Sequence, residues 1–197
     1  ITGETGTGKE LVARALHRLG PRRDKEFVAL NCATLAPDRV EEQMFGTAET
    51  LLGSFRKADG GTLFLDEVAV CPIPVQIKLL RAMETGVIQP VGTDAEIQTD
   101  VRIVAATNED LAPLVDAGLF RAEFLFRLNA FELRLPRLID RGYVIVLLYV
   151  HFVSQFCVTY DICPIEFPAV DAADPPSHPR PQPFRAIRQA AAAWRCA

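Results

Sequence analysis

The stretch GETGTGKE, residues 3–10, constrains the possible folds of this chain more than any other feature. It fits the pattern GxxxxGK, in which glycines let backbone N–H groups turn toward an anion. A helical pattern follows over residues 10–19, and the start of a helix adds the positive end of its dipole. A glycine-rich turn that only caps a helix is the alternative. The stretch predicts a phosphate-binding loop for ATP or GTP.

We expect the whole of this stretch to contact the nucleotide. Lys9 can reach the β- and γ-phosphates. Glu10 stands where such loops usually carry serine or threonine, so the hydroxyl that usually contacts Mg²⁺ is missing. The predicted ATP-binding residues are Gly3, Glu4, Thr5, Gly6, Thr7, Gly8, Lys9 and Glu10.

Predicted strands and helices alternate up to Arg141. Apolar runs of strand length lie at residues 27–32, 61–67, 101–108 and 131–135. Helical patterns lie at residues 10–19, 72–86, 111–117 and 122–128. This alternation predicts an α/β fold with a parallel sheet in three layers.

Composition limits the size of the core and the possible partners. With 197 residues, 49% of them hydrophobic, the chain can bury one full core. A net charge of −4 leaves no basic face wide enough to bind nucleic acid by itself. The five cysteines lack a zinc-binding spacing, and no signal-peptide pattern is visible. The apolar run at residues 143–153 is well short of the roughly 20 residues of a membrane span, so we expect a cytoplasmic protein without membrane contact.

The composition changes near Arg141. Every lysine of the chain lies before it, whereas half of the 14 prolines lie between residues 164 and 183. Prolines remove backbone donors and disfavour packed structure. We therefore predict one domain over residues 1–141, followed by a divergent and poorly ordered tail over residues 142–197.

Paired carboxylates follow the apolar run TLFL. In hydrolytic phosphate sites an aspartate such as Asp66 can orient Mg²⁺ through its waters, and a glutamate such as Glu67 can polarise the attacking water. A buried strand that ends in acidic loop residues is common, so the pair alone is weak evidence. Together with the phosphate loop, it indicates an ATP-hydrolysing site.

Several segments resemble, in order, the AAA+ central domain of bacterial enhancer-binding activators, the NtrC family that works with sigma-54 polymerase. These segments are GETGTGKELVARALH, FVALNCATL, ADGGTLFLDE, VQIKLLRAMETG, VRIVAATNEDL and LFRAEFLFRLNAFELRLPRL. The resemblance runs from residue 1 to about residue 141 and implies an AAA+ P-loop NTPase fold. A glutamate after the loop lysine is usual in that family.

The resemblance also implies roles for single residues. Asp66 and Glu67 match the Walker B pair, and Asn31 matches an asparagine that pairs with the Walker B glutamate and signals the γ-phosphate state. Asn108 matches sensor I, a polar residue that follows the next strand. The metal role, orienting Mg²⁺ through water, falls to Asp66.

Arg121 and Arg127 match arginines that resemble arginine fingers, which reach from one subunit into the ATP site of its neighbour. A guanidinium can neutralise the charge that develops on the γ-phosphoryl oxygens. Surface cations on an amphipathic helix are the alternative for both. The resemblance therefore implies a ring of identical subunits with ATP and Mg²⁺, acting on RNA polymerase holoenzyme and reaching DNA only through a domain that lies outside this sequence.

Residues 47–57, TAETLLGSFRK, stand where sigma-54 activators carry a longer surface loop with the motif GAFTGA. That motif is missing, as in HupR-type hydrogenase regulators, which the sequence resembles in this respect. We expect residues 50–55 to form a tight turn with Phe55 packed inward. We therefore expect regulation independent of sigma-54 and no stable sigma-54 complex.

The resemblance weakens after residue 138. The family continues there with a helical lid and a sensor II arginine, and neither can be placed in this sequence. A frameshift is one explanation for the divergent tail. The strand expected before Ile1 is missing too. Two alternatives to an ATPase stay open, namely a non-hydrolysing nucleotide-binding or architectural module of a response regulator, and a non-functional fragment.

Overall fold

The computed structural model describes residues 1–48 and 52–141. The chain divides into two units, Ile1–Pro136 and Arg137–Ala197, so the division falls slightly before the predicted boundary at Arg141. In the second unit the described residues form the 3-10 helix η3, Leu138–Arg141. The predicted proline-rich tail lies outside the described residues. The fold below is that of the first unit.

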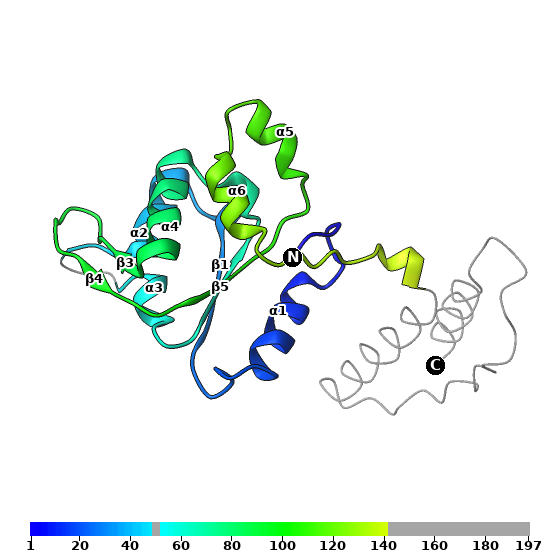
Figure 1. Ribbon diagram of the computed structural model, residues 1–197, viewed down its shortest axis with the longest axis horizontal. Helices are drawn as coiled ribbons and strands as arrows, with labels where there is room; N and C mark the ends of the chain where they lie inside the picture. The colour runs from blue at the N-terminus through cyan, green and yellow to red at the C-terminus, as the bar shows by residue number, and fades with distance from the viewer. Residues whose placement is uncertain (49–51, 142–197) are drawn as a thin grey trace, which may run out of the picture. The chain divides into compact units, whose positions relative to one another are not determined.

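A parallel sheet forms the centre of this unit (Figure 1). Its strands, in the order β1-β2-β5, are β1 (Phe27–Asn31), β2 (Thr62–Asp66) and β5 (Arg102–Ala105). Residues 62–65 of the central strand β2 are buried, which explains why that strand is apolar on both faces. The register places Asn31 opposite Asp66 at the carboxyl ends of β1 and β2. The predicted parallel sheet is confirmed.

Helices cover both faces of the sheet, in agreement with the predicted three layers. On one face α1 (Lys9–Arg18) packs through Ala13 against Phe64 of β2. The other face carries the larger core cluster, in which Leu63 and Leu65 of β2 pack with side chains from neighbouring helices. These helices are α2 (Pro37–Phe45), α3 (Ser54–Lys57) and α4 (Ile73–Thr85).

The remaining elements lie in connections. They are the 3-10 helices η1 (Cys32–Thr34) and η2 (Val68–Val70), the helices α5 (Leu111–Asp116) and α6 (Ala122–Leu128), and an antiparallel pair of short strands, β3 (Val87–Ile88) and β4 (Ile97–Gln98). The sequence patterns did not indicate the β3–β4 pair. Within the described residues, no helix combines the length and the apolar character that crossing a bilayer requires.

The strand predicted over residues 131–135 is wrong as a full strand. Thr2 forms isolated parallel bridges with Thr107 on one side and with Arg134 on the other. The Thr2 N–H donates to the Leu133 carbonyl at 2.8 Å, and the Leu135 N–H donates to the Thr2 carbonyl at 2.7 Å. A strand needs a ladder of partners, and in the described part of the chain this segment pairs only with Thr2, so pairing is confined to one bridge.

The ends of the short connection between α2 and α3 meet each other. A Cβ atom on Gly53 would lie 2.3 Å from the Gly46 backbone nitrogen, so only glycine fits there. The Ser54 hydroxyl donates to the Gln43 carbonyl at 3.0 Å, and the rings of Phe45 and Phe55 stack with centroids 5.4 Å apart. The inward packing of Phe55 is confirmed. The predicted tight turn is wrong in its second half, because Ser54 and Phe55 begin α3.

The Phe55→Ala variant should lower the free energy of unfolding by about 3–5 kcal/mol, because a buried ring that stacks on another ring is replaced by a cavity. Phe55 is 1% exposed, whereas Phe126 is 85% exposed. The matched control Phe126→Ala should change stability by less than about 0.5 kcal/mol. Urea unfolding of both variants measures the difference. Equal losses would show that the α2–α3 connection is not held by this ring pair.

Candidate ATPase site

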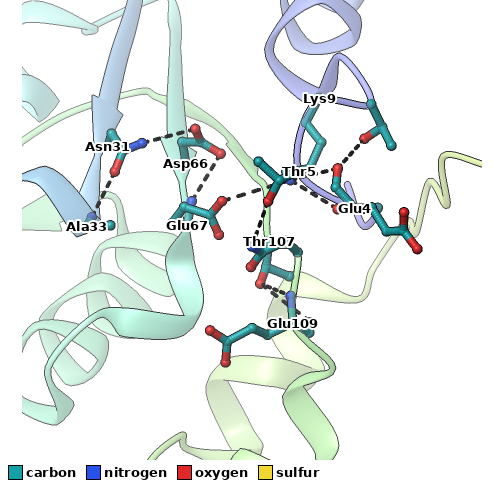
Figure 2. Close-up of polar contacts among 12 residues, drawn as sticks. Glu4, Thr5, Lys9, Asn31, Ala33, Asp66, Glu67, Thr107 and Glu109 are labelled. Carbon is teal, nitrogen blue, oxygen red and sulfur yellow. Dashed lines mark hydrogen bonds and ion pairs between the residues drawn. The ribbon is translucent and has the colours of Figure 1, made fainter. Parts of the chain in front are cut away.

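The phosphate loop is organised around the Lys9 side chain (Figure 2). This side chain is 7% exposed. Its ammonium donates to the Gly3 carbonyl at 3.0 Å. The Thr7 hydroxyl donates to the Glu4 carbonyl at 2.7 Å and closes the loop from within. The loop is therefore already folded around the cation that would face a phosphate.

The start of α1 offers backbone donors to an anion. Gly8, the N-cap residue of α1, has φ 89°, a left-handed conformation that favours glycine, and no side chain caps the helix. A Cβ atom on Gly6 would meet nothing within 4 Å, so the loop is open on that side. Uncapped N–H groups next to open space fit a phosphate group.

The Glu10 side chain is turned along α1 and is not brought into the loop. Its carboxylate accepts two hydrogen bonds from Arg14, at 2.7 and 2.9 Å. This is an exposed pair one helical turn apart. In this arrangement the Glu10 side chain does not point into the loop. Only its backbone N–H is left to make the predicted nucleotide contact.

The acidic pair lies at the carboxyl end of β2. Asp66 Oδ2 accepts a hydrogen bond from Asn31 Nδ2 at 3.2 Å, and Asp66 Oδ1 accepts one from the Glu67 N–H at 3.1 Å. The expected pairing of Asn31 with Glu67 is therefore not found, and Asn31 pairs with Asp66 instead. The register places Asn31 beside Asp66, while Glu67 turns toward the phosphate loop.

Glu67 has φ 51°, and among the described residues it is the only non-glycine residue with positive φ. Its carboxylate lies 4.0 Å from the Lys9 ammonium. Figure 2 marks this ion pair with a dashed line. A left-handed glutamate is strained, and such residues concentrate at functional sites. This backbone conformation aims the carboxylate at the loop rather than along the strand.

Asn108, beyond the end of β5, also reaches the loop. Its side-chain amide donates to the Thr5 hydroxyl at 3.0 Å. The preceding Thr107 is 2% exposed, and its hydroxyl accepts a hydrogen bond from the Glu109 N–H at 3.0 Å. Sequence reasoning missed Thr107, which fixes the turn that carries Asn108. The signal available in the sequence was the position of Thr107, directly before the predicted sensor I residue Asn108.

Arg121 and Arg127 interact with other parts of the subunit. Arg121 is the N-cap residue of α6, and its buried Nε makes no hydrogen bond in the described part of the chain, although it lies 3.4 Å from Glu123 Oε2. Arg127 is exposed and donates to the Met83 carbonyl at 3.1 Å. The structure thus brings Lys9, Glu67 and Asn108 together at the phosphate loop. It places the two arginines beside Glu123 and Met83, not at the loop of their own subunit.

The oxygen donors of the site fit Mg²⁺ held mainly through water and phosphate. Asp66 supplies a carboxylate next to the loop, and oxygen ligands suit this ion. No group of three or more histidine, cysteine or acidic side chains able to hold a metal is found within residues 1–48 and 52–141. Mg²⁺ often keeps several waters and binds through one or two carboxylates plus substrate phosphates, so this sparse donor set agrees with it.

The thiols of Cys32 and Cys71 lie behind the acidic pair. Both are free and buried, and their sulfurs are 3.1 Å apart. The hydrogen bond from Cys71, followed by burial and the nearby carboxylates, raises the pKa of Cys32 above its ordinary value. The thiol of Cys32 is therefore neutral at physiological pH and adds no charge beside Asp66.

Residues 4–6 of the phosphate loop are exposed to solvent. A cavity of about 570 Å³ is lined in part by β5 and by residues 127–133, and its lining does not include residues 3–9 or the acidic pair. The loop therefore faces solvent rather than this cavity.

Comparison with known proteins agrees with this site. Residues 1–134 match the model of the Sigma-54 interaction domain. The C4-dicarboxylate transport transcriptional regulatory protein DctD of Pseudomonas aeruginosa is 42% identical over 199 residues, covering 97% of this chain and 43% of DctD. The transcriptional regulator NtrC of Rhizobium meliloti is 48% identical over 163 residues, covering 79% of this chain and 34% of NtrC. The match to DctD takes in most of the residues after Arg141, so similarity to this relative does not end there.

Solved structures give the same result. Crystal structures of NtrX from Brucella abortus in complex with ADP and with ATP superpose with a TM-score of 0.81, at 36% and 37% identity, over 85% of this chain and 38% of NtrX. The chain thus spans about two fifths of the length of these relatives or less. It has the AAA+ P-loop NTPase fold, and it belongs to the family of Sigma-54 interaction domains.

Proposed function

We propose that this chain is the ATP-hydrolysing module of a bacterial transcriptional regulator that acts without a stable sigma-54 complex. The observation that carries the first part is the meeting of Lys9, Glu67 and Asn108 at one edge of the sheet. The relatives that span this region are named transcriptional regulators, and NtrX crystallised with ADP and with ATP.

Each group in the site has a chemical task in this proposal. The loop N–H groups and Lys9 bind the phosphates. Asp66, oriented by Asn31, would hold Mg²⁺ through water, and the bound ion would neutralise phosphate charge. Glu67 orients a water for attack on the γ-phosphate and accepts its proton. Asn108 holds the Thr5 side chain of the loop in place through its hydrogen bond.

The arginines complete the site in trans. Neither guanidinium is bonded to the phosphate loop of its own subunit; Arg121 lies beside Glu123, and Arg127 donates to Met83. In a ring, Arg121 and Arg127 would face the ATP of the next subunit, where a guanidinium offsets charge in the transition state. The ring would act on RNA polymerase holoenzyme, with DNA bound by another domain of the full-length protein.

Mixing two inactive variants of the full-length parent protein tests this arrangement. Lys9→Ala removes the phosphate cation but keeps the arginines, whereas Arg121→Ala keeps the loop. Each alone should hydrolyse ATP at least about 100-fold more slowly, and a mixture should recover part of the rate, because some interfaces pair an intact loop with an intact arginine. The control mixes Lys9→Ala with Glu67→Ala, which share the damaged site and should stay inactive. A first mixture as inactive as the control would refute the trans role, and inactive wild-type rings would favour a non-hydrolysing module.

The second part of the proposal depends on the α2–α3 connection. Gly46 and Gly53 touch, the Ala48 N–H donates to the Val91 carbonyl at 3.2 Å, and the Val91 N–H donates to the Gly46 carbonyl at 2.9 Å. Residues 49–51 lie outside the described residues. With both ends tied down, the chain between them has little length to project from a ring and grip a sigma factor.

We expect no stable complex between the full-length parent protein and sigma-54, with or without ADP and aluminium fluoride. Coupling of ATP turnover to sigma-54 requires a segment that contacts it in one nucleotide state and not in another, and the short connection lacks the GAFTGA motif. Light scattering with a GAFTGA-bearing relative as positive control measures this. A nucleotide-dependent complex with this protein would mean that the short connection is a working contact loop.

A further inference from the structure

Gln76 lies inside the subunit, on the face of α4 that packs into the core. It is 0% exposed, and its neighbours on that face are the apolar residues Val75, Leu79 and Ala82. A buried amide stabilises a fold only when its donors and acceptor have partners. The partners of Gln76 therefore show what this amide holds in place.

Among the described residues, the side-chain amide of Gln76 bonds to backbone groups of other segments. Its Nε2 donates to the Cys71 carbonyl at 2.8 Å and to the Leu119 carbonyl at 3.1 Å. Its Oε1 accepts from the Arg121 N–H at 2.9 Å. Because two partners are acceptors and the third is a donor, the orientation of the amide is fixed by chemistry.

These contacts join two segments with different roles. Cys71 follows η2, the 3-10 helix for which Glu67 is the N-cap residue. Leu119 and Arg121 lie directly before α6, a helix without a side-chain cap, and α6 packs beside α4. One side chain thus connects the segment after the hydrolytic glutamate to the backbone of Arg121.

We propose that Gln76 is a positioning residue that holds Arg121 where it can serve the ATP site of the neighbouring subunit. This inference rests on the proposed function, because it takes the trans role of Arg121 as given. Gln76 is fully buried and acts on Arg121 only through the backbone of residues 119–121. The bond to Cys71 ties the same amide to the segment that follows Glu67.

The variant Gln76→Met, made in the full-length parent protein, tests this role. Methionine has a similar length and removes every hydrogen bond of the amide. ATP affinity should stay at the wild-type value, because residues 3–9 and 66–67 are intact, while kcat should fall by about 100-fold through misplacement of Arg121. The matched control is Gln98→Met, which also removes a side-chain bond to a backbone carbonyl, that of Thr85 at 3.2 Å, but at an exposed position; its kcat should match that of wild type.

Subunit mixing separates positioning from general damage. A Gln76→Met subunit keeps an intact loop, so mixing it with Lys9→Ala subunits, whose Arg121 is correctly held, should restore part of the hydrolysis. The positioning role would be overturned if hydrolysis recovered when Arg121→Ala was mixed with Lys9→Ala but not when Gln76→Met was mixed with Lys9→Ala. Recovery with neither mixture would instead refute the trans role of Arg121, and wild-type kcat in Gln76→Met would also overturn the inference.

A second variant covers the case in which methionine prevents folding. Gln76→Glu keeps the acceptor for the Arg121 N–H, but an ionised carboxylate would face the carbonyls of Cys71 and Leu119. Burial and these carbonyls should raise the pKa of the new carboxyl group, and its protonated form can donate to one carbonyl. The kcat relative to wild type should therefore rise as the pH falls from about 8 to about 6. A pH-independent ratio would contradict the inference.

Discussion

The Lys9→Ala variant is expected to lose ATP binding, with affinity reduced by about 100-fold or more, because a charge-assisted contact to the β/γ-phosphates disappears. Lys9 is the lysine of the phosphate loop, and its side chain is almost fully buried within it. No other lysine or arginine occurs in residues 1–10, so nothing in the loop can replace its charge.

The loop itself should also change, since the Lys9 ammonium bonds to the Gly3 carbonyl and lies near Glu67. Calorimetric titration with ATP measures the loss in affinity. Lys25→Ala, which removes an exposed lysine before β1, is the matched control and should bind ATP like the wild type. Equal affinity of Lys9→Ala and wild type would show that the loop does not hold the phosphates.

The parts of the site that lie within one sequence segment could be predicted from the sequence. The phosphate loop is read from glycine spacing and a following helix, and the acidic pair from an apolar run that ends in carboxylates. Both signals are local, and the structure places them together through the parallel order of β1, β2 and β5. The alternation of strands and helices was sufficient for the α/β class.

Hydrogen-bond partners that depend on the direction of the backbone could not be predicted from the sequence. Asn31 bonds to Asp66 instead of Glu67, because the left-handed backbone at Glu67 turns the next side chain away from β1. No sequence pattern encodes positive φ at a glutamate, a residue that rarely adopts it. The length of the strand at residues 131–135 could not be predicted either, because it depends on which segment pairs with these residues.

Gln76 shows a signal that sequence reasoning could have used. It stands next to Val75 and one turn before Leu79 and Leu80, in the apolar stripe of a predicted helix. A polar amide in such a stripe must find partners after burial, so it marks a connection between segments. The sequence alone does not say which segments, because Cys71, Leu119 and Arg121 come together only in the folded subunit.

The Glu67→Gln variant should show the second large effect, a fall in hydrolysis of about 10²–10⁴-fold with ATP binding retained. Glutamine has the same shape as glutamate but cannot accept a proton from the attacking water. The left-handed backbone at position 67 stays in place, because the Glu67 N–H still donates to Asp66 and the strand β2 is unchanged. Lys9 loses its anionic neighbour at 4.0 Å, so the affinity for the polyanionic nucleotide should not fall.

Glu109→Gln is the matched control, because it removes the same charge close to the site. Figure 2 shows the Glu109 carboxylate directed away from Lys9 and Asp66, and its contacts with Thr107 use backbone atoms. This variant should hydrolyse ATP at nearly the wild-type rate, which would separate loss of the base from a general change in surface charge. Single-turnover hydrolysis and calorimetric ATP binding, measured on the full-length parent protein, distinguish the two effects. If Glu67→Gln hydrolysed ATP as fast as Glu109→Gln, the carboxylate beside Lys9 would not be the base. The strained backbone of Glu67 would then need another explanation.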